Sequence, residues 1–515
     1  MDLFIKIGML VVFFAVTISI GLYCRKHATD VNGFVLGGRS VGPWLTAFAY
    51  GTSYFSAVVF VGYAGQFGWK YGIAATWAGI GNALLGSLMA WAFLGRRTRV
   101  MTQHLDSATM PQFFQRRFNS PALKTAASAI IFIFLIPYTA SLYNGLSRLF
   151  GMAFDIDYSV CVIVMAVLTA VYVIAGGYMA TAINDFIQGI IMIVGIVAVI
   201  AAVLNSQGGF MEALNKLGQV SDPTVSETPG VFASFFGPDP LGLLGVVLLT
   251  SLGTWGLPQM VQKFYAIKSE QAINKGMIIS TIFAAIVAGG CYFLGGFGRL
   301  FDVDVATQGF DAVIPTMLSG LSPILIAVVV VLVLSASMST LSSLVLTSSS
   351  TLTLDFIKGR IVKDMDEKKQ LNVMRGLIVV FIAISVVLAI VQYKSSVTFI
   401  AQLMGVSWGA LAGAFLAPFL YGLYWKRATP AAVWASFIFS TVVMLANIFV
   451  KSSFPAVLQS PINAGAFCMI AGLIIVPVVS LVTPQLPQQH LDQVFSCYDR
   501  QVLVTVKDSI GDQNN

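Results

Sequence analysis

Ionisable side chains are scarce in this chain. Only 10% of its 515 residues are charged, and just three are histidines: His27, His104 and His490. All three lie outside the segments that we predict to span a membrane, and no Gly-rich phosphate-binding loop is present. A membrane enzyme needs acid–base or metal-ligating groups within its spans, and this sequence places almost none there. We therefore expect no enzymatic activity.

Cysteines are also few. The chain has five, scattered and without the spacing of a metal site: Cys24, Cys161, Cys291, Cys468 and Cys497. This pattern is typical of thiols in helix packing or in a tail. The net charge is +7, but the positions of the basic residues explain it, and we expect no nucleic-acid partner.

Hydrophobic residues, by contrast, make up 57% of the chain, and its mean hydropathy is +0.85. Because every backbone polar group in lipid must be satisfied within its own helix, this composition indicates an all-α polytopic membrane protein. We count about thirteen spans of suitable length. The first, at residues 3–24, is too long for a signal-peptide core and lacks a small-residue cleavage site, so we expect a retained helix.

Basic residues occur in alternate loops. They follow the first, third, seventh, ninth and eleventh predicted spans, and those after the seventh are Lys263, Lys268 and Lys275. The intervening loops are acidic or poor in charge, as at Glu212 and Asp222. The positive-inside rule then predicts an N-terminus outside and a cytoplasmic tail after Pro484, in a multi-pass protein of the cell membrane.

Hydroxyl side chains concentrate in the ninth predicted span. Ser339, Ser342 and Ser343 stand at i, i+3 and i+4 and share one helix face, while Ala336 and Thr340 lie on an adjoining strip. Small residues and hydroxyls also serve helix–helix packing, where they bond back to the preceding turn. The alternative is a site for a hard cation such as Na⁺, which prefers several oxygen ligands.

Two other spans contain breaks rich in glycine, hydroxyls or proline. Residues 49–56 interrupt the second span and residues 253–259 the seventh. Such breaks release backbone carbonyls that can bind ions or substrate, although each alone is also consistent with an ordinary kink. Because the two segments are five spans apart, they cross the membrane in opposite senses. This arrangement predicts an inverted repeat with a transport site between its halves.

One carboxylate lies near a predicted span. Asp185 stands at the start of the sixth, in Asn184-Asp185-Phe-Ile-Gln188. An aspartate there can cap the helix, where the dipole stabilises its charge. The alternative is that Asp185 faces a wet cavity and neutralises a bound cation.

These residues belong to motifs that resemble a known family. The motifs are Gly176-Gly177 with 184–188, the block 338–343, and 408–413 with Pro418. Together they resemble the sodium:solute symporters, which include sodium-coupled carriers of proline, pantothenate, sialic acid and sugars. The resemblance covers nearly the whole chain. It implies a LeuT-type fold, an inverted five-plus-five helix repeat with one extra helix before it and two after it.

The resemblance divides the chain into five parts. Residues 1–43 would form the extra helix and a cytoplasmic loop, 44–206 and 207–427 the two repeats, 428–484 two additional helices, and 485–515 a cytoplasmic tail.

The resemblance also implies sodium ligands. In relatives, one sodium ion is held by carbonyls and hydroxyls that match Thr52, Phe55, Ala336, Ser339 and Thr340 here. Some relatives bind a second sodium ion with an aspartate and three serines, which match Asp185, Ser339, Ser342 and Ser343.

Substrate residues follow from the same resemblance. Segments near 97–118 and 137–140 look closest to the proline carriers, in which a tyrosine matching Tyr138 belongs to the substrate region. The seventh-span break is more similar to the sugar carriers, and Tyr54 replaces an aspartate of the proline carriers. The expected substrate-site residues are Tyr54, Tyr138, Thr254, Trp255, Pro258 and Gln259.

We therefore predict a sodium-coupled secondary symporter that imports a small organic solute by alternating access. An amino acid such as proline or a small carboxylate is favoured, because few ionisable groups lie near the breaks and helix-end dipoles can hold such a molecule. A sodium-dependent receptor or sensor, and a symporter of pantothenate or a sugar, are the alternatives. The sequence leaves the oligomeric state open.

Overall fold

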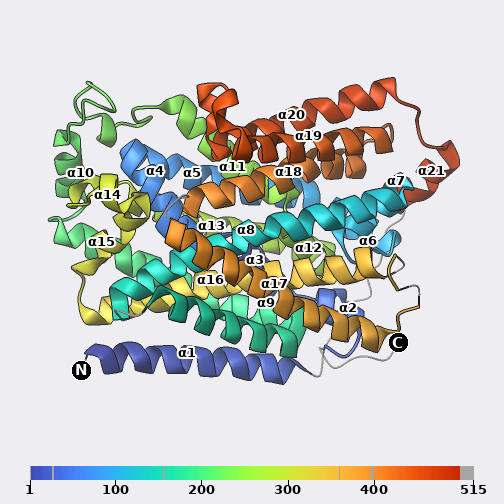
Figure 1. The fold of residues 1–515 in the computed structure, drawn as a ribbon, viewed down its shortest axis with the longest axis horizontal. Coiled ribbons are helices and arrows are strands. Elements are labelled where there is room, and N and C mark those ends of the chain that lie inside the picture. The colour runs from blue at the N-terminus through green and yellow to red at the C-terminus, as the bar shows by residue number, and fades with distance from the viewer. Residues whose placement is uncertain are drawn as a thin grey trace.

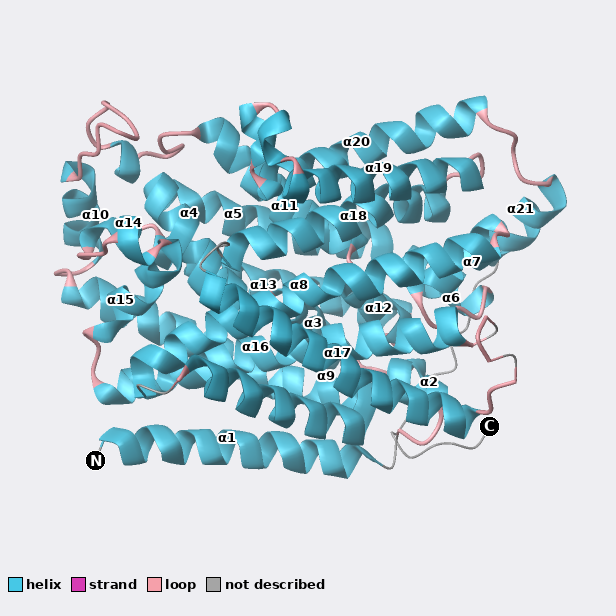
Figure 2. Cartoon of the chain, in the orientation of Figure 1, coloured by secondary structure: helices cyan, strands magenta, loops and turns pink. Residues whose placement is uncertain are grey.

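The computed structural model describes residues 2–25, 28–154, 157–358, 360–362, 364–395 and 400–498. Over these residues the chain is helical and has no β-strand, only isolated bridges (Figures 1 and 2). Ten helices are long and apolar enough to cross a membrane, or eleven if one bent pair counts as a span. The predicted all-α, multi-pass membrane architecture is confirmed.

The α-helices of the first half include the first broken span. They are α1 (Asp2–Cys24), α2 (Val31–Leu36), α3 (Pro43–Tyr54), α4 (Ala64–Tyr71), α5 (Thr76–Gly81), α6 (Arg96–His104), α7 (Met110–Phe118), α8 (Pro121–Phe154), α9 (Tyr158–Ser206) and α10 (Phe210–Gln219). Segments of π-helix, η3 (Val58–Tyr63), η5 (Asn82–Met89) and η6 (Trp91–Gly95), continue α3 and α5.

The second half contains the other broken span and the serine-rich helix. Its α-helices are α11 (Pro240–Gly256), α12 (Pro258–Ala266), α13 (Glu270–Gly295), α14 (Val305–Gln308), α15 (Val313–Ser319), α16 (Pro323–Thr351), α17 (Glu367–Ser395), α18 (Ile400–Tyr424), α19 (Pro430–Phe449), α20 (Pro461–Val482) and α21 (Gln488–Phe495).

The helical element α9 contains two of the predicted spans. Gly177, with φ 55° and ψ −147°, interrupts its helical backbone. Before this point α9 lies against α1, because Tyr172 packs on Gly21. Ala153, at the end of α8, accepts a bond from Lys6 near the other end of α1. After it, Asn184 bonds to the Thr17 carbonyl, so the chain returns along α1. Helix length alone gives fewer than thirteen spans, because a reversal such as this one joins two spans in one helical element.

Both predicted helix breaks are present. Helix α3 ends where Phe55 becomes extended (φ −82°, ψ 122°), and η3 resumes three residues later. Helix α11 ends at Gly256, Leu257 is extended (φ −75°, ψ 123°), and α12 begins at Pro258 with a bend of 46°. Proline suits the first position of a helix because that position needs no amide donor.

Helix α16 lies at the centre of the molecule, with α3, α8, α9 and α17 around it (Figure 1). Every residue of α16 from position 329 to 351 is buried. A helix buried on all sides and rich in serine must place its hydroxyls against other helices. By contrast, α1 exposes Phe4, Val11 and Val12, as expected of a helix at the lipid-facing edge.

Part of the expected tail is packed onto the protein. Helix α21 buries Leu491 and Val494, and His490 Nε2 lies 3.2 Å from the carbonyl oxygen of Arg117. The remainder of the predicted tail, 499–515, lies outside the described residues.

Candidate functional site: oxygen and charge clusters at the first helix break

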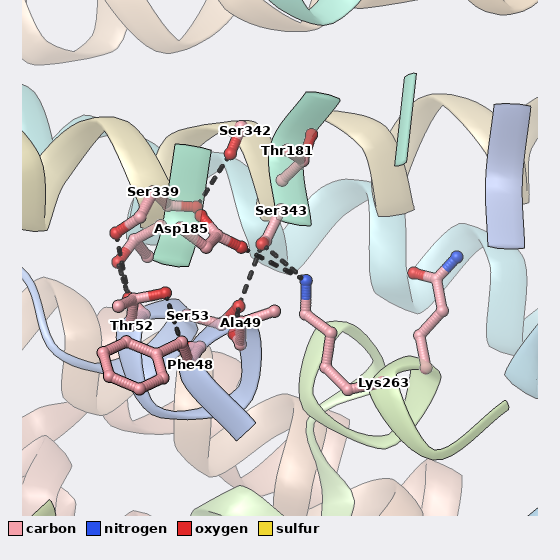
Figure 3. Close-up of polar contacts among 12 residues, drawn as sticks. Phe48, Ala49, Thr52, Ser53, Thr181, Asp185, Lys263, Ser339, Ser342 and Ser343 are labelled. Atoms are coloured by element: carbon pink, nitrogen blue, oxygen red, sulfur yellow. Dashed lines mark hydrogen bonds and ion pairs between the residues drawn. The ribbon is translucent and has the colours of Figure 1, made fainter. Parts of the chain in front are cut away.

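Five oxygens meet where the break after α3 contacts α16. The Thr340 hydroxyl lies 3.0 Å from the carbonyl oxygen of Thr52, 3.2 Å from that of Phe55 and 3.1 Å from that of Ala336. The Ser339 hydroxyl lies 3.1 Å from the Thr52 carbonyl oxygen (Figure 3). It also lies 3.0 Å from the carbonyl oxygen of Ala336. These are the five residues predicted as ligands of the first sodium ion, and the structure brings all five together.

Local structure explains why these oxygens are available. The chain leaves the helix at Phe55, so carbonyls in the last turn of α3 have no following helical turn to accept from. A threonine hydroxyl carries one proton and can donate to only one of the three carbonyls near it. The cluster is therefore rich in acceptor lone pairs, which is the environment that a hard cation prefers.

Asp185 lies beside this cluster but not at a helix start. It is fully buried and follows Gly177 by two helical turns inside α9. Its carboxylate accepts no hydrogen bond from the residues that the structure describes. The prediction that Asp185 begins a span is wrong, and the geometry gives no support to helix capping, since preceding residues already form the helix.

The nearest cation to Asp185 is Lys263 on α12. Its Nζ lies 3.9 Å from Asp185 Oδ2 and 3.0 Å from Ser343 Oγ, to which it donates (Figure 3). Our assignment of Lys263 to a loop after the seventh span is wrong. All nine residues of α12 are buried, because the bend at Leu257 directs the chain back into the protein.

The three serines of α16 that were predicted to bind a second sodium ion have different surroundings. Ser343 Oγ lies 2.9 Å from Ser53 Oγ of α3, and Ser53 donates in turn to the Ala49 carbonyl. Ser342 donates to the carbonyl oxygen of Ser339, one turn back on its own helix. Ser343 thus joins α3 to α12, a role that the sequence did not indicate.

Among the expected substrate residues, Tyr138 lies near the second break. Its buried ring meets Trp408 edge-on, at 6.0 Å between centroids. The Trp408 ring in turn covers Gly253, so closely that a Cβ there would come within 2.5 Å of it. Pro258 starts α12, and the side chain of Gln259 is buried with neither amide atom bonded to a described residue.

Thr254 and Trp255 point toward η5 instead. Thr254 Oγ1 lies 2.8 Å from the Gly86 carbonyl oxygen, and Trp255 Nε1 donates to the Leu85 carbonyl over 2.8 Å. Tyr50 of α3 also donates to the Gly86 carbonyl, so both broken helices bond to one position of η5. The side chain of Tyr54 lies outside the described part of the structure.

A signal for Lys263 did exist in the sequence. It stands five residues after the break-forming Pro258 and directly before Phe264 and Tyr265. An ionisable residue in such a segment is costly in a membrane protein and indicates a functional partner inside.

Comparisons with known proteins identify the family of this chain. The model of the sodium:solute symporter family matches residues 34–439. The chain belongs to this family. It is therefore a sodium-coupled symporter of small solutes, as we predicted from the residues and their resemblance.

One sequence relative and two solved structures illustrate what this chain is similar to. The sodium/proline symporter of Staphylococcus aureus (strain JH9) is 31% identical over 450 residues, which cover 85% of this chain and 84% of that protein. A substrate-bound, outward-open Na⁺-coupled sialic acid symporter superposes with a TM-score of 0.72 at 17% identity, covering 94% of this chain and 99% of that one. An inward-facing structure of Mhp1 gives a TM-score of 0.50 at 11% identity, over 88% and 94% of the two chains. These structures confirm the predicted LeuT-type fold.

Proposed function

We propose that this symporter binds a sodium ion between α3 and α16 and imports a small zwitterion or carboxylate, with an amino acid such as proline as the first candidate. The observation that carries the sodium assignment is the meeting of five oxygens from two helices that are far apart in sequence, with three carbonyls around the one Thr340 hydroxyl.

The position of this cluster links ion binding to the shape of the protein. Thr52 and Phe55 belong to the broken helix, whereas Ser339 and Thr340 belong to the buried α16. A sodium ion held by both would stabilise the conformation in which they are close, and so prepare the broken helix for solute. By linkage, solute must then tighten sodium binding by the same factor.

A zwitterion suits the two breaks. Each break places the C-terminal end of one helix next to the start of another: α3 next to η3, and α11 next to α12. Helix N-termini favour a carboxylate and C-terminal carbonyls favour an ammonium group. The sodium/proline symporter that resembles this chain is consistent with such a solute. Tyr138, Gln259 and Pro258 would line the solute site, with Thr254, Trp255 and Tyr54 at its border.

Orientation and internal organisation complete the proposal. We place the protein in the cell membrane with its N-terminus outside and its C-terminus in the cytoplasm, on the basis of the positive-inside rule. Residues 44–206 and 207–427 would be the two inverted repeats, flanked by an N-terminal helix and two C-terminal helices.

Uptake into proteoliposomes tests the proposal. Purified protein is reconstituted, and accumulation of radiolabelled proline is measured with an inward sodium gradient and with an equal potassium gradient. We expect accumulation only with sodium. A panel containing pantothenate, glucose and small carboxylates identifies the solute if proline is not accumulated. A protein that binds a panel compound in sodium but accumulates none is a receptor, and contradicts transport.

A further inference from the structure

The buried cation Lys263 lies beside the proposed sodium-binding residues. Its side chain is only 3% exposed, and Asp185 is 0% exposed. Among the ion pairs of the described residues, this is the one whose two side chains are both less than a tenth exposed. Burying an ammonium group is costly, so its surroundings must compensate for the water that it loses.

The surroundings of the Lys263 ammonium group come from α16 and α9, and α3 is linked to it through Ser343. Ser343 of α16 accepts its hydrogen bond at 3.0 Å, Asp185 of α9 lies at 3.9 Å, and the ring of Tyr178 of α9 lies 5.1 Å away. Ser343 is also 2.9 Å from Ser53 of α3. A hydroxyl, a carboxylate and an aromatic face are all suited to a cation.

The residue before Lys263 also contacts α16, and this contact fixes the position of Lys263 along that helix. Its neighbour Gln262 accepts a hydrogen bond from Thr347, which follows Ser343 by one helical turn on α16, and donates to the Val35 carbonyl. Two successive residues of α12 thus contact two successive turns of α16. These contacts of Gln262 help to direct the neighbouring lysine at Ser343.

We propose that the ammonium group of Lys263 is a tethered cation that occupies the position between Asp185 and Ser343, and that the protein consequently binds a single sodium ion, at the five-oxygen cluster. A free sodium ion bound to Asp185 would lie close to the positive charge of Lys263, which is next to the same carboxylate. Two like charges so close together in a buried site repel strongly. Ser342, whose hydroxyl already donates to Ser339, would then remain a packing residue. This inference rests on the proposed function.

The inference also explains a chemical difference between the five-oxygen cluster and the second cluster, which is formed by Asp185, Lys263 and Ser343. The five-oxygen cluster is made of carbonyls and hydroxyls, which leave a net positive charge when a sodium ion binds. The second cluster is already neutral, because Asp185 and Lys263 compensate each other. A cation that is part of the chain cannot be released to the other side of the membrane, so it contributes no driving force for accumulation.

Equilibrium binding of radioactive sodium to the purified protein, without solute, tests the inference. We expect one ion per chain for the natural protein. In Lys263→Met, which removes the charge but keeps an unbranched chain, Asp185 becomes free and we expect two ions. The double variant Lys263→Met, Asp185→Asn should return to one. Lys275→Met, a charge loss at an exposed position of α13, is the matched control and should stay at one.

The outcomes separate the two proposals. Two ions bound to the natural protein, or one ion bound to a folded Lys263→Met variant, would overturn the tethered cation and leave sodium coupling intact. No specific sodium binding to the natural protein would contradict the proposed function itself. If Lys263→Met does not fold, the count for the natural protein still decides, and Lys263→Arg, which keeps the charge, should also bind one ion.

Discussion

The hydroxyl of Thr340 lies 3.0 Å from the carbonyl oxygen of Thr52, a residue 288 positions earlier in the chain. This contact joins the first broken helix to the buried α16 at the proposed sodium site. A sodium ion bound there would couple its own binding to the separation of the two helices.

Removal of either hydroxyl should weaken sodium binding. Ser339→Ala or Thr340→Ala deletes one neutral ligand, which we expect to cost about 1–3 kcal/mol, or roughly ten- to a hundredfold in sodium affinity. The sodium concentration for half-maximal uptake reports this change. Ser349→Ala is the control, because Ser349 is buried on the same helix but donates to Val345 within it. Unchanged sodium dependence in both site variants, with normal expression, would remove them from the ligand set.

The pair Asp185–Lys263 should show strong energetic coupling. Asp185→Asn leaves a buried ammonium group unpaired, and breaking a buried pair on one side costs about 3–5 kcal/mol. We expect Asp185→Asn and Lys263→Met each to lower the unfolding temperature of the purified protein. The double variant should be more stable than the sum of the two losses predicts.

The exposed pair Arg96–Glu270 is the matched control for this cycle. Its side chains are 54% and 47% exposed, so Glu270→Gln should change the free energy of unfolding by less than about 1 kcal/mol. Additive effects of Asp185→Asn and Lys263→Met would show that the two charges do not interact, and would contradict the pairing.

The family resemblance named the residues of the first cluster, and local rules are consistent with that assignment. Gly51 and the hydroxyls around it weaken a helix where carbonyls are needed, and Ser339 and Thr340 lie on adjoining strips of one helix by their spacing alone. The second cluster depends on tertiary structure. Lys263 enters the core only because α12 bends by 46° and packs on α16, and sequence alone cannot give that direction. The orientation of Trp255 toward Leu85 likewise depends on how α11 packs on η5.

Gln259 offers a test of the solute site. Its buried amide has no partner among the described residues, so Gln259→Leu should leave the unfolding temperature unchanged or higher. If the amide binds solute, the solute concentration for half-maximal uptake should rise roughly ten- to a hundredfold, while sodium binding without solute stays normal. Gln262→Leu is the comparison, because that amide makes two hydrogen bonds and its loss should destabilise the fold. A Gln259→Leu variant with normal solute affinity would exclude this residue from the site.

Gly177 should tolerate no side chain. Its φ of 55° with ψ −147° is a backbone conformation that glycine alone adopts readily, and an added Cβ would lie 2.8 Å from the backbone oxygen and the ring of Phe34. Since α9 reverses along α1 at this residue, Gly177→Ala should displace the half of α9 that carries Asp185. We expect a loss of at least about 1–3 kcal/mol in stability, and with it reduced sodium-driven uptake per folded molecule.

Gly376→Ala on α17, where an added Cβ meets no atom within 4 Å, is the control and should behave as the natural protein. Thermal unfolding and uptake measured on both variants decide the point, and a Gly177→Ala protein with normal stability and uptake would show that the reversal does not need glycine.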